Sequence, residues 1–224
     1  MKKHVTIKNA SDISLLIEHT LLRPEATTCD IKRLCCEAIQ YKFHGVCVPP
    51  VYVEEANRNL KDTDCAVVTV VGFPFGTNLT VTKVEEARQV KLCGATEIDM
   101  VMRIGALKEG NYHAVYDDIR SVVEVDTSVP VKVIIENGLL DRAEKIAACL
   151  LAVKAGAAFV KTSTGFQTTG ATAEDVALMR AVVGDRIQIK AAGGIRNFRM
   201  AYALINAGAN RLGCSSSLSI VTEK

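Results

Sequence analysis

The sequence predicts an α/β protein of the (β/α)8, or TIM barrel, class. Eight short segments with strand propensity alternate with segments of helical periodicity, which is the pattern of a parallel sheet joined by helices. Of the 224 residues, 49% are hydrophobic, only 5% are aromatic and none is Trp. Such an aliphatic composition is typical of strands buried on both faces. The length suits one barrel domain spanning residues 1–224.

The eight predicted strands each end in polar, Gly or Pro residues, as strands that run into loops do. A short N-terminal helix is expected before the first strand, covering the bottom of the barrel. A doubly wound open sheet is the alternative, but no G-x-G-x-x-G motif follows the first strand. The strands are expected at Ile17–Leu22, Gly45–Pro49, Ala66–Pro74, Glu97–Met102, Val131–Glu136, Phe159–Ser163, Ile187–Ala192 and Arg211–Ser215.

A weak internal repeat supports this alternation. Gly94, Gly156 and Gly208 each follow a helical segment and precede a strand within a few residues. Glycine commonly ends a helix in the left-handed conformation. The three glycines therefore predict the same helix-to-strand corner at three places in one domain.

Charge and cysteine content exclude several classes of protein. The net charge of +2 gives no basis for a nucleic-acid or membrane surface, and the N-terminal residues lack the apolar run of a signal peptide. The eight cysteines include no C-x-x-C pair, and the four histidines lack metal-ligand spacing. We expect a cytoplasmic protein with reduced thiols and without a metal site.

The active site of a (β/α)8 barrel is formed by the carboxyl-terminal strand ends and the loops that follow them. Lys161 and Lys190 stand near the ends of adjacent predicted strands, which lie about 4.8 Å apart, so their ammonium groups should approach closely. The polar residues expected to converge at this end are Glu18, Thr20, Cys47, Asp99, Lys132, Glu136, Lys161, Lys190, Ser215 and Ser216.

A close pair of lysines can supply the neutral amine that attacks a carbonyl group. Lowering a lysine pKa from about 10.4 to about 7 takes about 4.6 kcal/mol. A second positive charge about 4 Å away supplies roughly 4 kcal/mol at an effective dielectric of 20. The alternative is that both lysines form salt bridges with carboxylates such as Asp99 and Glu136 and only fill the barrel. Two inward lysines with few inward carboxylates favour the functional interpretation.

Asp99 is the candidate proton carrier. It alternates with apolar residues in its strand, where aspartate is unfavourable. It either balances lysine charge or moves protons in carbinolamine and enamine steps. The two roles are compatible.

Two glycine-rich strand ends predict a phosphate site. Ala192–Arg196 (AGGIR) follows the seventh strand, and Leu212–Ser217 (LGCSSS) belongs to the end of the eighth. Barrels commonly bind phosphate through backbone N–H groups of these two loops. Arg196 either adds charge to this site or faces solvent. The candidate phosphate-binding residues are Gly193, Gly194, Ser215 and Ser216.

Five segments, in order over nearly the whole chain, together resemble the deoxyribose-phosphate aldolase family. That family consists of cofactor-free class I aldolases on a (β/α)8 barrel, which reversibly cleave 2-deoxy-D-ribose 5-phosphate to D-glyceraldehyde 3-phosphate and acetaldehyde. The segments are Ile17–Pro24 (IEHTLLRP), Glu97–Val101 (EIDMV), Val131–Glu136 (VKVIIE), Val160–Gly165 (VKTSTG) and Ile189–Arg196 (IKAAGGIR).

The resemblance implies a role for each matching residue. Lys161 would form the Schiff base, Lys190 would be the second lysine that makes its amine available, and Asp99 would be the acid/base group. A homodimer is what the family suggests. The resemblance matches Gly165, Gly193, Gly194, Ser215 and Ser216 to phosphate-binding positions and Cys47 to a cysteine near the pocket. The barrel register adds Thr162, in the loop after the sixth strand, to the substrate-binding residues, and Glu18 and Thr20, at the end of the first strand, as possible pocket residues.

The chain departs from the family pattern at two pocket positions and at its end. Glu18 stands where the family usually has Asp, and Arg103 where it usually has Asn. The chain also stops at Lys224 without the tyrosine tail of some relatives. Two alternatives stay open: another Schiff-base sugar-phosphate aldolase of the transaldolase type, and a non-catalytic barrel that binds a sugar phosphate.

Overall fold

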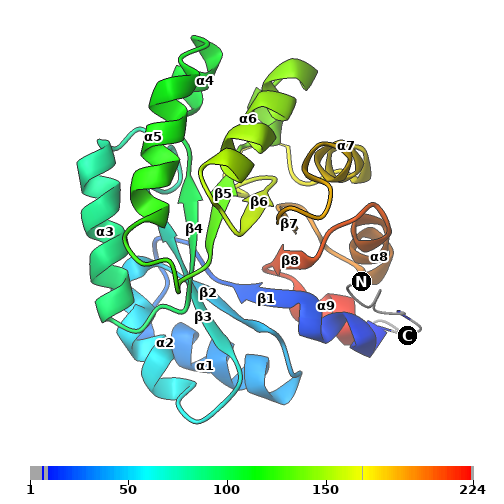
Figure 1. Ribbon diagram of the computed structural model, residues 1–224. Coiled ribbons are helices and arrows are strands. Elements are labelled where there is room, and N and C mark those ends of the chain that lie inside the picture. The colour runs from blue at the N-terminus through cyan, green and yellow to red at the C-terminus, as the bar shows by residue number, and fades with distance from the viewer. Residues whose placement is uncertain (1–6, 8–9, 168, 223–224) are drawn as a thin grey trace.

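A computed structural model describes residues 7, 10–167 and 169–222 and shows a closed barrel of eight parallel strands. The strands lie in the centre with helices around them (Figure 1). Strand order follows the sequence, and β8 pairs with β1 to close the barrel. The predicted (β/α)8 class is therefore confirmed. The strands are β1 (Ile17–Thr20), β2 (Gly45–Val48), β3 (Ala66–Val71), β4 (Glu97–Val101), β5 (Val131–Ile134), β6 (Phe159–Lys161), β7 (Gln188–Ala192) and β8 (Arg211–Cys214).

The helices that connect and surround the strands are of two kinds. The α-helices are α1 (Thr28–Gln40), α2 (Val53–Asn59), α3 (Thr80–Leu92), α4 (Ile104–Lys108), α5 (Tyr112–Val123), α6 (Arg142–Lys154), α7 (Ala173–Val183), α8 (Phe198–Asn206) and α9 (Ser217–Thr222). The 3₁₀ helices are η1 (Ala10–Leu16), η2 (Pro50–Tyr52) and η3 (Asn137–Leu139).

Most strands end earlier than the sequence predicts. The third was expected to reach Pro74, but β3 ends at Val71, because Gly72 adopts φ +63 and turns the chain out of the ladder. The first was expected to reach Leu22, but β1 ends at Thr20. The residues beyond each strand form loops at the carboxyl-terminal end of the barrel, which is where the cavity lies.

The predicted helix corners and the N-terminal helix are present. Gly94, Gly156 and Gly208 have φ values of +103, +83 and +116, which favour glycine because a Cβ atom is strained there. The N-terminal segment forms the 3₁₀ helix η1, whose Ile13 is fully buried and which packs against α8 and α9.

The barrel has an aliphatic layer outside it and a mixed interior. Between strands and helices, side chains such as Val46, Ile98 and Val133 form one large apolar cluster. Inside the barrel, Cys47 and Val68 belong to a small separate cluster near β2 and β3, whereas β1 and β4–β8 contribute charged groups. No helix in the described part of the chain is long and apolar enough to span a membrane.

Candidate active site

A cavity of about 430 Å³ opens at the carboxyl-terminal end of the barrel. The loops after β1, β6, β7 and β8 surround it, as predicted for a barrel active site. Lys161 is the only lysine among the described residues that line it. The lining includes the predicted residues Thr20, Lys161, Gly165, Gly193, Gly194, Ser215 and Ser216.

The two candidate lysines lie side by side and share one carboxylate oxygen. Lys161 pairs with Lys190 in the β6–β7 register. The Nζ atoms of Lys161 and Lys190 lie 2.7 and 2.5 Å from Oδ2 of Asp99. Lys161 is 2% exposed, whereas Lys190 and Asp99 are fully buried. The structure thus brings together the three residues expected to carry the chemistry, with Lys161 facing the cavity.

Glu18 occupies a more central position than the sequence suggests. Its carboxylate accepts hydrogen bonds from Lys190 and from Arg211, the latter at 2.9 Å from Nη1 to Oε1. Oε1 also lies 3.4 Å from Nζ of Lys132. Its side chain is fully buried and does not line the cavity. Glu18 therefore pairs with cations inside the barrel and does not face the cavity.

A deeper ionic layer lies below Asp99. Lys132 Nζ lies 2.9 Å from Asp99 Oδ1 and 2.6 Å from Glu97 Oε2. Glu97 Oε2 is 3.4 Å from Arg211 Nη1, and its other oxygen is 3.0 Å from Nε2 of His44. Lys132 was a candidate in the sequence, but Glu97, Arg211 and His44 were not, because they stand at or before the strand beginnings.

Among the residues that the structure describes, these groups form one continuous network in which cations outnumber carboxylates by four to three. The expectation of few inward carboxylates was thus too low, and the predicted salt bridges to Asp99 are present. Glu136 does not join them. The cations are Lys132, Lys161, Lys190 and Arg211, and the anions are Glu18, Glu97 and Asp99.

The network shifts the pKa values of its buried members. Burial alone would raise the pKa of Asp99, but the surrounding lysine ammonium groups outweigh it and hold that pKa well below its usual range. Burial likewise opposes charge on Lys190, yet Asp99 and Glu18 raise the pKa of Lys190 above its usual value. Asp99 is therefore an ionised carboxylate at neutral pH, and Lys190 an ammonium group.

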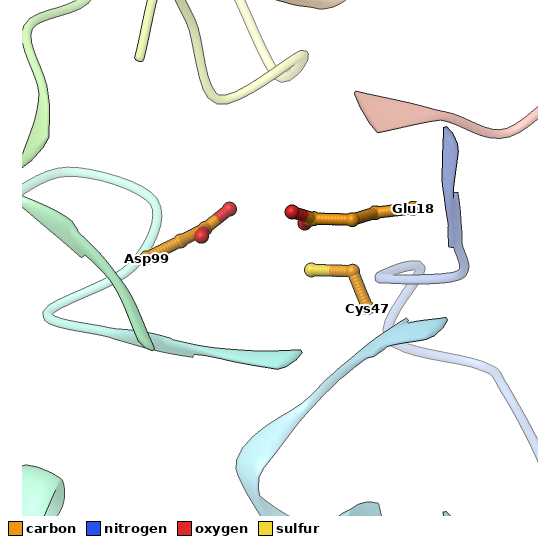
Figure 2. Close-up of side chains that lie close together, drawn as sticks. All are labelled: Glu18, Cys47 and Asp99. Carbon is orange, nitrogen blue, oxygen red and sulfur yellow. The ribbon is translucent and has the colours of Figure 1, made fainter. Parts of the chain in front are cut away.

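Glu18, Cys47 and Asp99 point toward one another from β1, β2 and β4 (Figure 2). One potential ligand atom from each lies within 4.8 Å of the others. Lysine ammonium groups already contact both carboxylates, and burial raises the pKa of Cys47 to about 11. Because the thiol is protonated at neutral pH and the oxygens are paired with cations, this donor set suits a metal poorly.

The predicted phosphate loops border the cavity. Gly165, Gly193 and Gly194 have φ values of +85, +90 and +75. A Cβ atom on Gly170 would lie 2.2 Å from the carbonyl oxygen of Gly193. These glycines allow the loops after β6 and β7 to approach closely beside Lys161. Arg196 is exposed to solvent and also lines the cavity. Both of the positions expected for it, at the phosphate site and in solvent, are therefore compatible with the structure.

Thr162 does not line the cavity, although it was expected to bind substrate. Its hydroxyl group donates to the carbonyl oxygen of Ala192 and accepts from the Ala192 N–H, both at 3.0 Å. Side chains alternate along a strand, so an inward Lys161 turns Thr162 outward. Thr162 ties the end of β6 to β7.

Glu136 positions the loop after β6. Its Oε2 accepts hydrogen bonds from the Thr164 hydroxyl at 2.5 Å and the Thr164 N–H at 3.1 Å. The Thr164 hydroxyl in turn accepts from the N–H of Phe166. Phe166 lines the cavity and meets Phe73 of the β3–α3 loop edge-on, with ring centroids 5.2 Å apart. Phe166 therefore contributes an aromatic ring to the cavity wall, and Phe73 supports it from behind.

The model of the DeoC/LacD family of aldolases matches residues 12–221 of this chain. The chain belongs to that family. A protein named deoxyribose-phosphate aldolase from Thermotoga maritima is 56% identical over 210 residues, which is 94% of this chain and 85% of that protein. The protein of the same name from a Geobacillus species is 54% identical, covering 96% of each chain.

Solved structures show the same fold in this family. A chain from Coccidioides immitis superposes with a TM-score of 0.95 at 43% identity, covering 97% of this chain and 87% of the other. A deoxyribose phosphate aldolase from Aeropyrum pernix, described as a tetramer, gives a TM-score of 0.90 at 31% identity, covering 96% of this chain and 92% of the other.

Proposed function

We propose that this family member is a deoxyribose-phosphate aldolase, reversibly cleaving 2-deoxy-D-ribose 5-phosphate to D-glyceraldehyde 3-phosphate and acetaldehyde. The observation that carries the proposal is a cavity lined by both a buried lysine, Lys161, and glycine and serine loops suited to phosphate. The substrate carries an aldehyde at one end and a phosphate at the other. The names of the Thermotoga and Geobacillus relatives support this choice of substrate.

Lys161 acts as the nucleophile in this proposal. Its neutral Nζ attacks C1 of the open-chain sugar, and loss of water gives an imine. The protonated imine accepts the electron pair of the C2–C3 bond while the C3 hydroxyl loses its proton, which releases glyceraldehyde 3-phosphate. Protonation of the remaining two-carbon enamine and addition of water then release acetaldehyde and restore the amine.

Asp99 and Lys190 assist these proton transfers. Asp99 Oδ2 lies within hydrogen-bond distance of both lysine Nζ atoms, so it can accept a proton from Lys161 and return it, directly or through water. Lys190 remains an ammonium group and repels positive charge on Lys161. Because the iminium group serves as the electron sink, the proposed reaction requires neither a metal nor an organic cofactor.

The phosphate of the substrate is assigned to the loops after β6, β7 and β8. Backbone N–H groups near Gly165, Gly193 and Gly194, with the hydroxyl groups of Ser215 and Ser216, provide donors for the anion. Thr20 lines the same cavity.

We also propose a cytoplasmic homodimer. The eight free thiols suit a reducing compartment. The Aeropyrum pernix relative is described as a tetramer, which supports self-assembly but not a dimer in particular. Analytical ultracentrifugation tests the assembly, and a monomer or another oligomer would contradict the dimer.

The decisive experiment is borohydride trapping with acetaldehyde followed by peptide mass spectrometry. We expect the added mass on Lys161, and an unchanged labelling pattern in Lys91→Met, which alters a half-exposed lysine on α3. Labelling at another lysine would contradict the assignment. Phosphate-ligand binding without any trapping would indicate a non-catalytic barrel.

A coupled assay of 2-deoxyribose 5-phosphate cleavage tests the reaction itself. We expect acetaldehyde as a product and the same rate with and without EDTA. A different carbonyl product would indicate another Schiff-base aldolase, and loss of activity in EDTA would indicate a metal-dependent enzyme.

A further inference from the structure

The ionic network of the barrel interior runs from the cavity to the opposite end of the barrel. From Lys161 it passes through Asp99 to Lys132, at 2.7 and 2.9 Å. From Lys132 it continues to Glu97 at 2.6 Å and on to His44 at 3.0 Å. The Lys161 side chain is 3% exposed and the His44 side chain, just before β2, is 27% exposed. Charge changes at one end are therefore linked by direct contacts to the other.

The cations of this network are held unequally. Nζ of Lys132 lies within 3.4 Å of three carboxylates, and Nζ of Lys190 contacts two, Glu18 and Asp99. Lys161 contacts one, Asp99, within the described part of the chain. Lys161 is therefore the network lysine with the fewest carboxylate contacts, and it is the one that faces the cavity. A change in network charge reaches Lys161 through these contacts.

We propose that Glu97, Arg211 and His44 set the pH at which Lys161 becomes a neutral nucleophile, although none of them lines the cavity. This inference rests on the proposed Schiff-base role of Lys161. The three residues act electrostatically through the network and are not catalytic residues. Losing a negative charge from the network makes Lys161 release its proton more readily, and losing a positive charge makes it release the proton less readily.

The remaining ionisable groups around Lys161 are common to every variant of the test. They act as a constant background, so a difference between variants reports on the altered residue. These groups are Glu18, Cys47, Asp99, Lys132 and Lys190 inside the barrel, and Arg23, Arg196 and Cys214 at the cavity.

The test measures the rate of acetaldehyde trapping on Lys161 by borohydride as a function of pH. Glu97→Gln should lower the midpoint of the rise by about one pH unit. Coulomb's law gives that order of magnitude for unit charges separated by about 10 Å at an effective dielectric of 20. Arg211→Met should raise the midpoint by a similar amount. The double variant Glu97→Gln/Arg211→Met removes one negative and one positive charge, so the net charge of the network is the same as in the wild type. Its midpoint should therefore return close to the wild-type value.

Variants of His44 test the same idea with little risk to folding, because this side chain reaches solvent. His44→Lys places a permanent positive charge near Glu97, whereas His44→Gln places none. We expect the midpoint of His44→Lys to lie a few tenths of a pH unit below that of His44→Gln. Glu85→Gln, which removes a carboxylate paired with Arg88 at the surface of α3, should leave the midpoint unchanged.

The outcomes separate this inference from the proposed function. Opposite shifts for Glu97→Gln and Arg211→Met support the inference, because damage to the fold would not reverse sign with charge. Shifts of the same sign, or equal midpoints for the two His44 variants, overturn it. Trapping on Lys161 with unshifted midpoints removes only this inference, whereas absence of trapping on wild-type Lys161 removes the proposed function as well.

Discussion

Two buried lysine clusters of this protein balance their charge in different ways. Outside the barrel, Lys83 of α3 pairs with Asp118 of α5 at 2.7 Å, and both side chains are fully buried. Lys83 also donates to the carbonyl oxygen of Val101 at 2.8 Å, and Thr80 donates to the second Asp118 oxygen. One cation thus meets one anion. Gly72 leaves room for the lysine, since a Cβ atom there would lie 2.8 Å from its Cε.

Inside the barrel, one cation lacks a carboxylate of its own. Lys161 and Lys190 share Asp99, and Lys161 faces the cavity. Complete pairing makes Lys83 a structural residue that fixes the end of β4 between α3 and α5. Incomplete pairing beside a cavity leaves an amine that can lose its proton and react. Burial alone therefore does not distinguish a reactive lysine from a structural one.

The largest difference between the two clusters should appear when each loses a member. Lys161→Met should lower kcat by about 10⁴-fold or more, because no amine remains to form the imine. Its free energy of unfolding should not fall, because the substitution removes the excess cation. Steady-state kinetics and urea unfolding measure the two effects. Retention of more than a few per cent of the activity would contradict the role of Lys161.

Asp118→Ala should have the opposite profile. It leaves Lys83 buried without its carboxylate, which should lower the free energy of unfolding by about 3–5 kcal/mol. The matched variant Lys83→Met/Asp118→Leu removes both charges and should recover most of that loss. In folded Asp118→Ala the pH profile of trapping on Lys161 should match the wild type. A shifted profile would show that the two clusters are coupled.

Lys190→Leu tests the shared carboxylate. Without this ammonium group, Asp99 contacts only Lys161 and Lys132 among the described lysines. Its negative charge then stabilises the Lys161 ammonium more strongly, so Lys161 should hold its proton more tightly. We expect kcat/KM to fall about 100-fold at neutral pH, with partial recovery at higher pH as Lys161 deprotonates. Lys91→Leu, at the surface of α3, is the control. A near-normal rate would remove Lys190 from the mechanism.

The smallest effect should be the dependence of stability on alkaline pH. Burial lowers the pKa of Lys83 below 10.5 despite Asp118. The folded state then binds fewer protons than the unfolded state, so this residue makes stability rise as pH approaches 10.5. In the barrel, carboxylates outweigh burial and raise the pKa of Lys132 and Lys190, so their contribution is present below 10.5 and lost at higher pH.

Urea unfolding between pH 8.5 and 10.5 measures this difference, the interval being set by the ordinary lysine pKa of about 10.4. Lys83→Met should lose the rise in stability over this interval. The control variant Lys91→Leu, which replaces a half-exposed lysine, should keep this rise in stability. An unchanged slope in Lys83→Met would show that Lys83 keeps its proton throughout.

The fold and the centre of the site could be predicted because both depend on local patterns. Strand order and glycine corners follow from alternation and turn residues, and the adjacency of Lys161 and Lys190 follows from barrel order. The lower layer could not be found this way. Glu97 and Arg211 lie at strand beginnings, which the rule for active-site placement ignores. Each is two residues before an inward-facing position of its own strand, Asp99 and Gly213, and this spacing could have indicated that they also face inward.

Two other residues have side-chain directions that the sequence did not reveal. Thr162 was placed in the site by its sequence neighbours, whereas strand alternation turns its side chain toward Ala192. Glu136 was considered as a partner for the lysines, but its residue adopts φ +55, in the left-handed region, and its carboxylate binds Thr164. Side-chain direction decides these roles, and composition at a strand end does not reveal it.

The ionic filling of the barrel has a consequence for behaviour at high temperature. Hydration of charged groups becomes less favourable on heating, so the cost of burying Glu18, Asp99 and Lys190 away from water falls as temperature rises. Aliphatic packing gains no comparable advantage there. The cost of keeping these charges buried at the centre of the barrel should therefore be smaller at high temperature than at room temperature.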